Sequence, residues 1–135
     1  MFWTIKQQKK LIKSLFSKSK ITYVDIGTNE GNFLEYLGKF CNFKKIICFE
    51  PIGDLANKIS KKFTKKNIEV NNIALSNKKK SKKFYEYEIS SQSSLYKQND
   101  KFKSLKKLKK ISLINTITFD EKFKKKEKID FCKID

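Results

Sequence analysis

Residues 21–31 have the sequence Ile-Thr-Tyr-Val-Asp-Ile-Gly-Thr-Asn-Glu-Gly. The first six form an apolar run, interrupted by the acid Asp25, that predicts a short strand buried on both faces. A loop containing Gly27 and Gly31 follows, and from Asn32 onward the apolar residues recur with helical spacing. A strand, a glycine loop and a helix open a nucleotide-binding α/β unit, whose ligand lies at the carboxyl end of the strand.

The glycine loop favours a ligand without phosphate. It lacks the middle glycine of the dinucleotide fingerprint G-x-G-x-x-G, which lets the backbone approach a pyrophosphate closely. Asp25 precedes the loop and Glu30 lies within it, and two carboxylates would repel a pyrophosphate. S-adenosylmethionine suits the loop better, because it carries an ammonium and a sulfonium group.

A second apolar run, Ile46 to Phe49, ends at Glu50. An acid at the end of the second strand, about 20 residues past a glycine loop, is placed to accept hydrogen bonds from both ribose hydroxyls. Asp25, the two glycines and Glu50 therefore predict an adenosyl-binding crevice in which both acids face one ligand. The same residues are compatible with an ordinary α/β turn beside a surface carboxylate.

Six segments of the chain occur in the order seen in a known family. They are Tyr23-Val-Asp-Ile-Gly-Thr-Asn-Glu-Gly-Asn-Phe33, Cys48-Phe-Glu-Pro51, Asn71-Asn-Ile-Ala-Leu-Ser-Asn77, Ser93-Ser-Leu95, Thr116-Ile-Thr-Phe-Asp-Glu121 and Ile129-Asp-Phe-Cys-Lys-Ile-Asp135. With these segments the chain resembles the FkbM-type methyltransferases of the class I methyltransferase superfamily. The resemblance covers roughly residues 21–135.

The resemblance implies a fold and an activity. The fold is α/β, a Rossmann-like, doubly wound and mostly parallel sheet with helices on both faces and an antiparallel hairpin insertion. The activity is S-adenosylmethionine-dependent O-methylation of a hydroxyl on a sugar or a secondary metabolite. The expected cofactor-binding residues are Asp25, Gly27, Asn29, Gly31 and Glu50, and the resemblance also implies that Asn72 and Ile73 lie near the adenine.

Asp135 is the candidate catalytic residue. In a sheet wound outward from the first strand, the strand that ends at Asp135 is expected beside the one that ends at Ile26, so that Asp25 and Asp135 face one crevice. A carboxylate there can act as the general base, but it can also orient the acceptor, hold a cation or cap a turn. The family's pattern continues past this aspartate, so the chain is expected to be truncated at its C-terminus.

Composition predicts one small domain. The chain has 135 residues and a formal net charge of +18, and all 32 of its basic residues are lysine. Specific readers of nucleic acids rely on the bidentate fork of arginine, so the charge predicts only weak affinity for polyanions or acidic membranes. Two alternatives remain open, an RNA methyltransferase and a non-catalytic module, incomplete as a domain, that binds a nucleotide or a partner.

Other residue types exclude several classes of protein. The three cysteines lack zinc-finger spacing and the chain has no histidine, so neither a metal site nor a disulfide framework is expected. No run of residues approaches a membrane span, and the first twenty residues lack the features of a signal peptide. The expected compartment is the cytoplasm.

Residues 1–20 predict an amphipathic basic helix that precedes a domain spanning residues 21–135. One interpretation packs this helix on the edge of the fold. The other places it on a membrane surface, with Phe2 and Trp3 entering the headgroup layer.

The remaining segments complete the expected order of elements. Ser90 to Ser94 are expected to form a loop, which in the family lies near the mouth of the active site. Further along, we expect a helix capped by Asp54 and ending near Phe63, a strand over 68–70 and a charged turn over 78–83. A strand over 84–89, with Tyr85, Tyr87 and Ile89 on one face, is expected to pair with a strand over 111–118, and a short helix or lid is expected within 98–110. The last expected elements are a short helix opened by Asp120 and a buried strand over 129–134.

Overall fold

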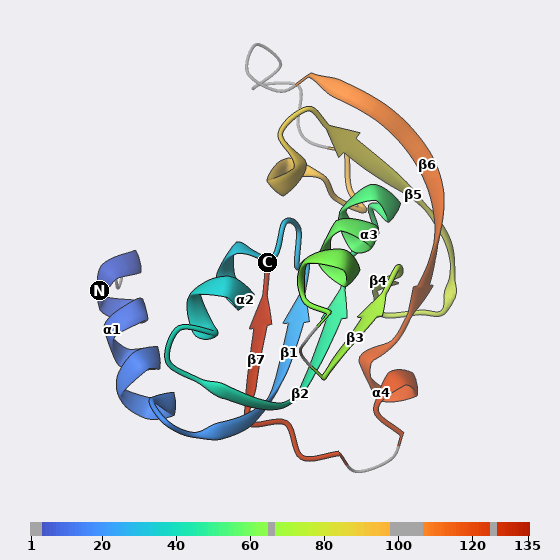
Figure 1. The fold of residues 1–135 in the computed structure, drawn as a ribbon. Helices are drawn as coiled ribbons and strands as arrows, with labels where there is room; N and C mark the ends of the chain where they lie inside the picture. Colours follow the sequence, from blue (N-terminus) through green and yellow to red (C-terminus); the bar gives the residue numbers. More distant parts are fainter. Residues whose placement is uncertain (1–3, 65–66, 98–106, 125–126) are drawn as a thin grey trace.

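The computed structural model describes residues 4–64, 67–97, 107–124 and 127–135. Its strands form two sheets, which we call sheet A and sheet B (Figure 1). The helices are α1 (Ile5–Phe16), α2 (Asn32–Leu37), α3 (Gly53–Lys62), α4 (Phe119–Lys122) and the 3-10 turn η1 (Ser90–Gln92). The strands are β1 (Lys20–Ile26), β2 (Asn42–Phe49), β3 (Ile68–Asn71), β4 (Ala74–Leu75), β5 (Lys80–Tyr87), β6 (Leu108–Ile117) and β7 (Phe131–Ile134).

Sheet A is parallel and has the strand order β3-β2-β1-β7. In its register, Asp25 of β1 lies opposite Cys48 of β2 on one side and Lys133 of β7 on the other. The chain moves outward from β1 to β3 and then returns to place β7 on the opposite side of β1. The strand order therefore reverses at β1, which confirms the predicted neighbour of the first strand and the doubly wound α/β fold.

Sheet A is covered on both faces, with α2 and α3 on one of them. On one face, buried side chains such as Tyr23 and Ile46 pack against Leu34 and Leu37 of α2 and Ile59 of α3. On the other face, Val24, Ile47 and Phe49 form a second cluster. Phe123, which ends α4, packs against this second cluster together with Ile73 and Leu75. Alternation of side chains along the strands supplies apolar residues to both clusters, as expected for a sheet covered on two sides.

Helix α1 packs on the edge of the fold, which confirms the first interpretation of the N-terminal segment. Thr4 caps the helix in a capping box with Gln7. Ile12 and Phe16 pack against the core, and the ring of Phe16 stacks on Phe131 with 5.2 Å between centroids. Phe2 and Trp3 lie outside the described residues. None of the helices in the described ranges is long and apolar enough to cross a bilayer.

Sheet B is a curved hairpin with a short third strand, and it leans over the carboxyl ends of sheet A (Figure 1). Strands β5 and β6 are antiparallel, as predicted, and β4 pairs with β6 in parallel. The prediction that Tyr85, Tyr87 and Ile89 share one face is wrong for Ile89, because β5 ends at Tyr87 and Ile89 is an exposed residue before η1. Phe84 and Tyr87 are buried, and the register with β6 shifts between Glu86 and Tyr87, where Lys109 of β6 is the extra residue.

Two further expectations are corrected by the backbone. Ile52, and not Asp54, is the N-cap of α3, and it makes no side-chain capping bond. The lysine-rich turn is shorter than predicted, because Lys80 to Lys83 already pair with β6. Of the segment 98–110, residues 98–106 lie outside the described residues, and Leu108 to Lys110 begin β6.

Candidate functional site

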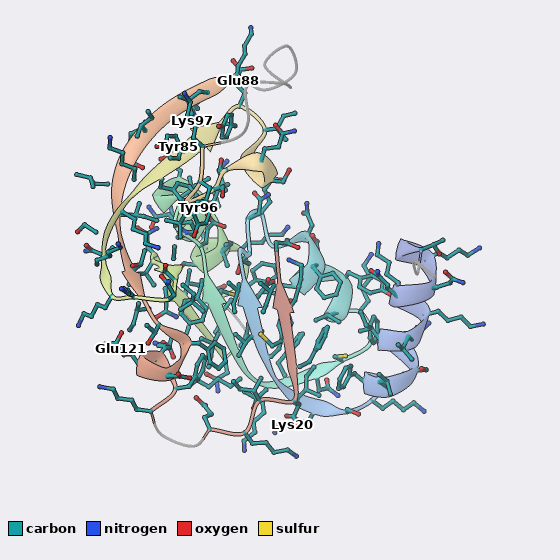
Figure 2. All side chains as sticks on the ribbon, turned by 180° about the vertical axis from the view of Figure 1, so that it is seen from behind. Lys20, Tyr85, Glu88, Tyr96, Lys97 and Glu121 are labelled. Carbon is teal, nitrogen blue, oxygen red and sulfur yellow. The ribbon has the colours of Figure 1, made fainter. Side chains whose placement is uncertain are left out.

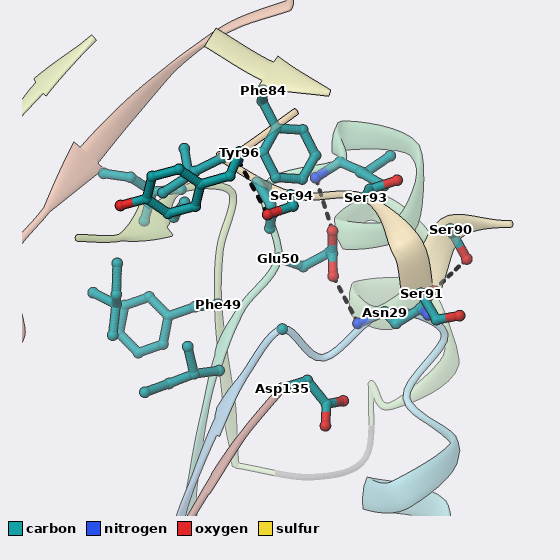
Figure 3. Close-up of a pocket in the computed structure, with 18 residues that line it drawn as sticks. Asn29, Phe49, Glu50, Phe84, Ser90, Ser91, Ser93, Ser94, Tyr96 and Asp135 are labelled. Carbon is teal, nitrogen blue, oxygen red and sulfur yellow. Dashed lines mark hydrogen bonds between the residues drawn. The ribbon is translucent and has the colours of Figure 1, made fainter. Parts of the chain in front are cut away.

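A cavity of about 520 Å³ lies between the carboxyl ends of β1, β2 and β7 and the inner side of sheet B (Figure 3). Its volume is within the usual range for sites that bind small molecules. Sheet A contributes Ile26, Gly27, Asn29, Phe49, Glu50, Pro51, Ile52 and Asp135 to its lining. The other side contributes Ile73, Ala74, Leu75, Phe84, Ser90, Ser91, Ser93, Ser94, Leu95 and Tyr96.

The lining differs in charge from the rest of the chain. Among the described residues it contains two carboxylates, Glu50 and Asp135, and no lysine, although the chain has 32 basic and 14 acidic residues. Apolar side chains from Phe49, Ile73 and Leu75 form part of the wall. The cavity therefore offers acceptors of hydrogen bonds and negative charge beside an apolar surface, inside a strongly cationic protein.

Glu50 is held rigidly in this cavity. Its side chain follows β2 and is only 3% exposed. The backbone N–H of Asn29 donates to Oε2 at 2.6 Å, and that of Ile52 donates to Oε1 at 2.8 Å (Figure 3). Burial raises the pKa of Glu50, the two N–H donors oppose this shift, and the charge of Asp25 adds to it. Each oxygen keeps a lone pair for a further donor.

Asn29 joins the glycine loop to the serine loop of sheet B. It adopts a left-handed conformation with φ of 53°, which asparagine tolerates better than most residues. The Ser90 hydroxyl donates to its Oδ1 at 2.8 Å (Figure 3). The prediction that Ser90 to Ser94 lie near the mouth of the site agrees with the structure, since four serines of this loop line the cavity.

The two glycines of the loop have different roles. Gly27 lines the cavity with φ of 77°, and an added Cβ there would lie 3.3 Å from the Cβ of Asp135. Gly31 has the same φ but does not line the cavity. An added Cβ at Gly31 would lie 2.8 Å from the ring of Phe63, which packs behind the loop. Gly31 therefore lets α2 and α3 approach each other, and its expected contact with a cofactor stays a prediction.

Asp25 lies beneath the cavity and does not line it, so the expectation that Asp25 and Asp135 face one crevice is wrong in this respect. Asp25 is fully buried and Lys133 connects it to Asp135. The ammonium of Lys133 lies 3.5 Å from Oδ1 of Asp25 and forms an ion pair with Oδ2 of Asp135. The three side chains thus form a buried-to-exposed cluster, in which only Asp135 reaches the cavity.

Burial raises the pKa of Asp25, and the charge of Lys133 opposes the shift. Oδ2 of Asp25 has no hydrogen-bond partner of good geometry in the described part of the chain, although the Tyr23 hydroxyl is close enough to lower this pKa. Conversely, burial and the charge of Asp25 raise the pKa of the Tyr23 hydroxyl. The contacts with Lys133 and Tyr23 therefore offset only part of the cost of burying the ionised carboxylate of Asp25.

This geometry predicts a pH-dependent effect for Asp25→Asn. A carboxyl group whose pKa is raised by folding contributes stability that is fully present below its unfolded pKa and is lost as the pH rises through its folded pKa. The Asp25→Asn variant has no ionisable group at this position, so its stability does not fall with pH for this reason. We expect its stability relative to the wild type to rise with pH, by up to about 1.4 kcal/mol per pH unit within that interval. Urea unfolding of both proteins between pH 4 and 8 checks this, and a constant difference would contradict it.

Of the two residues expected near the adenine, Ile73 lines the cavity and Asn72 does not. The side-chain amide of Asn72 donates to the backbone carbonyls of Glu50 and Pro51 at 2.8 and 3.0 Å. Asn72 therefore fixes the loop that carries Glu50. Of the expected site residues, the structure brings together Gly27, Asn29, Glu50, Ile73 and Asp135 in the cavity lining, and it places Asp25, Gly31 and Asn72 around it.

Sequence reasoning missed Lys133 and Phe84. Lys133 stands two residues before Asp135, and this spacing puts both side chains on the same side of an extended strand. That spacing was a usable signal. Phe84 reaches the cavity because sheet B lies over the carboxyl ends of sheet A, and the sequence of β5 alone does not indicate this packing.

The family model of the methyltransferase FkbM domain matches residues 25–135. The chain belongs to the FkbM methyltransferase family. A search of curated protein sequences gives no match. Among solved structures, the FkbM domain is similar to an rRNA methylase from Streptococcus thermophilus, with 17% sequence identity and a TM-score of 0.42. The similarity covers 55% of this chain and 42% of that chain, less than half of the methylase.

The family implies S-adenosylmethionine as the cofactor, and the residues of the cavity fit this group. Glu50 has two oxygens with free lone pairs for ribose hydroxyls, each already fixed by one backbone donor. Ile73, Leu75 and Phe49 offer an apolar wall to an adenine ring. The lining residues that the structure describes include no lysine to repel a cationic donor.

Proposed function

We propose that this FkbM domain binds S-adenosylmethionine in the cavity and methylates a hydroxyl of a sugar or a secondary metabolite. The observation that carries the proposal is the negatively charged, lysine-free lining in a chain of net charge +18. Electrostatic attraction and repulsion are strong in a partly enclosed site, so a cationic ligand is favoured there over a phosphate-bearing one.

The cofactor supplies an electrophilic methyl group, and the chain supplies binding and alignment. In this proposal Glu50 accepts hydrogen bonds from the ribose, while Ile73 and its apolar neighbours contact the adenine. Gly27 keeps the backbone close to the ligand, because a side chain there would be strained and would crowd Asp135. The hydroxyls of Ser90 to Ser94 line the same cavity and can bind a polar acceptor.

Asp135 is the proposed group that receives the proton of the acceptor hydroxyl. Its carboxylate lines the cavity and is exposed enough to reach an acceptor. The ion pair with Lys133 fixes its position next to Gly27. Transfer of the proton to this carboxylate as the oxygen attacks leaves the methylated product neutral, which is the role of a general base.

Isothermal titration of the full chain tests the assignment. We expect S-adenosylmethionine and S-adenosylhomocysteine to bind, and NAD to bind at least about tenfold more weakly because its phosphates would meet the carboxylates of Glu50 and Asp135. Tight binding of NAD and none of the other two would refute both the methyltransferase proposal and its variant with an RNA acceptor. It would favour a module that binds dinucleotides.

The proposed compartment is the cytoplasm, where thiols such as that of the buried Cys48 stay reduced.

A further inference from the structure

The side of sheet B that faces away from the cavity carries an unusual set of residues. In the antiparallel register, Ser81, Lys83 and Tyr85 of β5 lie opposite Asn115, Leu113 and Ile111 of β6. Their neighbours Phe84 and Thr116 are buried and point to the inner side. Because side chains alternate along a strand, Ser81, Lys83, Tyr85, Ile111, Leu113 and Asn115 lie on the outer side of sheet B. We call these six residues, together with the exposed Lys109 at the register shift near Ile111, the outer face of sheet B.

This outer face exposes large aliphatic side chains. Leu113 is 75% exposed and Ile111 is 51% exposed. Side chains project from β6 on the side of sheet B that faces away from sheet A (Figure 2). Lys83 and Lys109 are exposed beside the two aliphatic residues, and the seven residues of the face include no acid. Exposed aliphatic groups beside cationic side chains, on a face without acids, indicate a surface that binds a partner.

We propose that the outer face of sheet B docks on an anionic lipid surface. Insertion of Ile111 and Leu113 at the headgroup boundary removes apolar area from water. Lys83 and Lys109 then lie at the level of the anionic headgroups, which attract them. The net charge of +18 adds long-range attraction toward such a surface.

The chemistry of the face favours lipid over other partners. Nucleic-acid surfaces rely on arginine and on exposed aromatic rings that stack on bases, whereas this face offers lysine, aliphatic groups and the half-buried ring of Tyr85. A second copy of the chain would bring the same lysines and a further charge of +18 against the first, which repels it.

Docking in this orientation leaves the cavity accessible. Phe84 lines the cavity from the inner side of sheet B, so the docked face and the cavity lie on opposite sides of one sheet. A water-soluble cofactor and acceptor can therefore enter while the outer face contacts lipid. The inference does not depend on the proposed reaction, because the outer face contains no residue of the cavity lining.

Sedimentation of the full chain with vesicles tests this inference. The vesicles are phosphatidylcholine alone or with about one third phosphatidylglycerol, so that their surface charge is comparable to an anionic leaflet. We expect binding to the anionic vesicles, at least about tenfold weaker binding to the neutral ones, and weakening at higher salt. Ile111→Thr combined with Leu113→Thr, which keeps good strand formers, is expected to lower the affinity by about tenfold or more.

Matched variants elsewhere in the chain give the control. Helix α1 also exposes two leucines, so Leu11→Ala with Leu15→Ala is expected to leave vesicle binding unchanged within about twofold. Lys83→Glu with Lys109→Glu is expected to weaken binding much more than Lys6→Glu with Lys10→Glu on α1, although both pairs change the net charge equally. Circular dichroism verifies that each variant is folded.

Four results would overturn the inference. They are equal effects of the two lysine pairs, loss of binding only in the α1 leucine variant, binding to RNA with none to anionic vesicles, and self-association of the chain that is abolished by the double threonine variant.

Discussion

Glu50→Ala is expected to weaken the binding of S-adenosylhomocysteine by about 1–3 kcal/mol, or roughly 5- to 150-fold in Kd. The variant removes the only carboxylate of the cavity whose two oxygens are both oriented by backbone donors among the described residues. It leaves the ribose hydroxyls without their charged acceptor. Calorimetric titration of the variant and the wild type measures the difference directly.

The control for this variant is Glu30→Ala. Glu30 is an exposed carboxylate in the same glycine loop and does not line the cavity, so the affinity of that variant is expected to stay within about twofold of the wild type. Glu50→Ala also leaves the N–H groups of Asn29 and Ile52 without a partner, and its melting temperature must therefore be measured. A folded variant with unchanged affinity would remove Glu50 from the ribose.

Gly31→Ala is expected to destabilise the protein by about 2–5 kcal/mol. The residue has φ of 77°, where a side chain costs about 1–2 kcal/mol. The new methyl group would also lie 2.8 Å from the ring of Phe63, and overpacking of this kind costs about 1–3 kcal/mol. A loss of this size is a large part of the stability of a small domain, so unfolding in urea should show it clearly.

Gly53→Ala is the matched control. Gly53 is the first residue of α3, has no left-handed φ, and would place its Cβ 3.6 Å from the nearest atom, which is an ordinary contact. In that position alanine is expected to be neutral or to stabilise by up to about 1 kcal/mol. A loss at Gly31 no larger than at Gly53 would mean that the turn and the Phe63 contact adapt easily, contrary to the packing described above.

The sequence predicted the first half of the fold well because its signals there are local. The apolar run of β1, the glycine loop and the acid after β2 each have a steric or electrostatic reason that acts within a few residues. These reasons identified Gly27 and Glu50 as residues of one site before the structure was known. The position of β7 beside β1 also followed from a general rule of winding.

Other features depend on contacts between distant residues, and the sequence did not reveal them. Asp25 was expected to face the ligand because it lies near the end of the first strand, next to the glycine loop. In the structure its partner is Lys133, 108 residues later, which pairs with it below the cavity. The position of Phe84 in the cavity lining likewise depends on how sheet B packs over sheet A, which the sequence of β5 alone does not reveal.

The most direct test of the central claim is a crystal structure of the full chain with S-adenosylhomocysteine. The account predicts that the ligand lies in the cavity between sheet A and sheet B, with both ribose hydroxyls within hydrogen-bond distance of Glu50 and the adenine against Ile73. A ligand bound elsewhere, or bound in the cavity with its ribose away from Glu50, would contradict it.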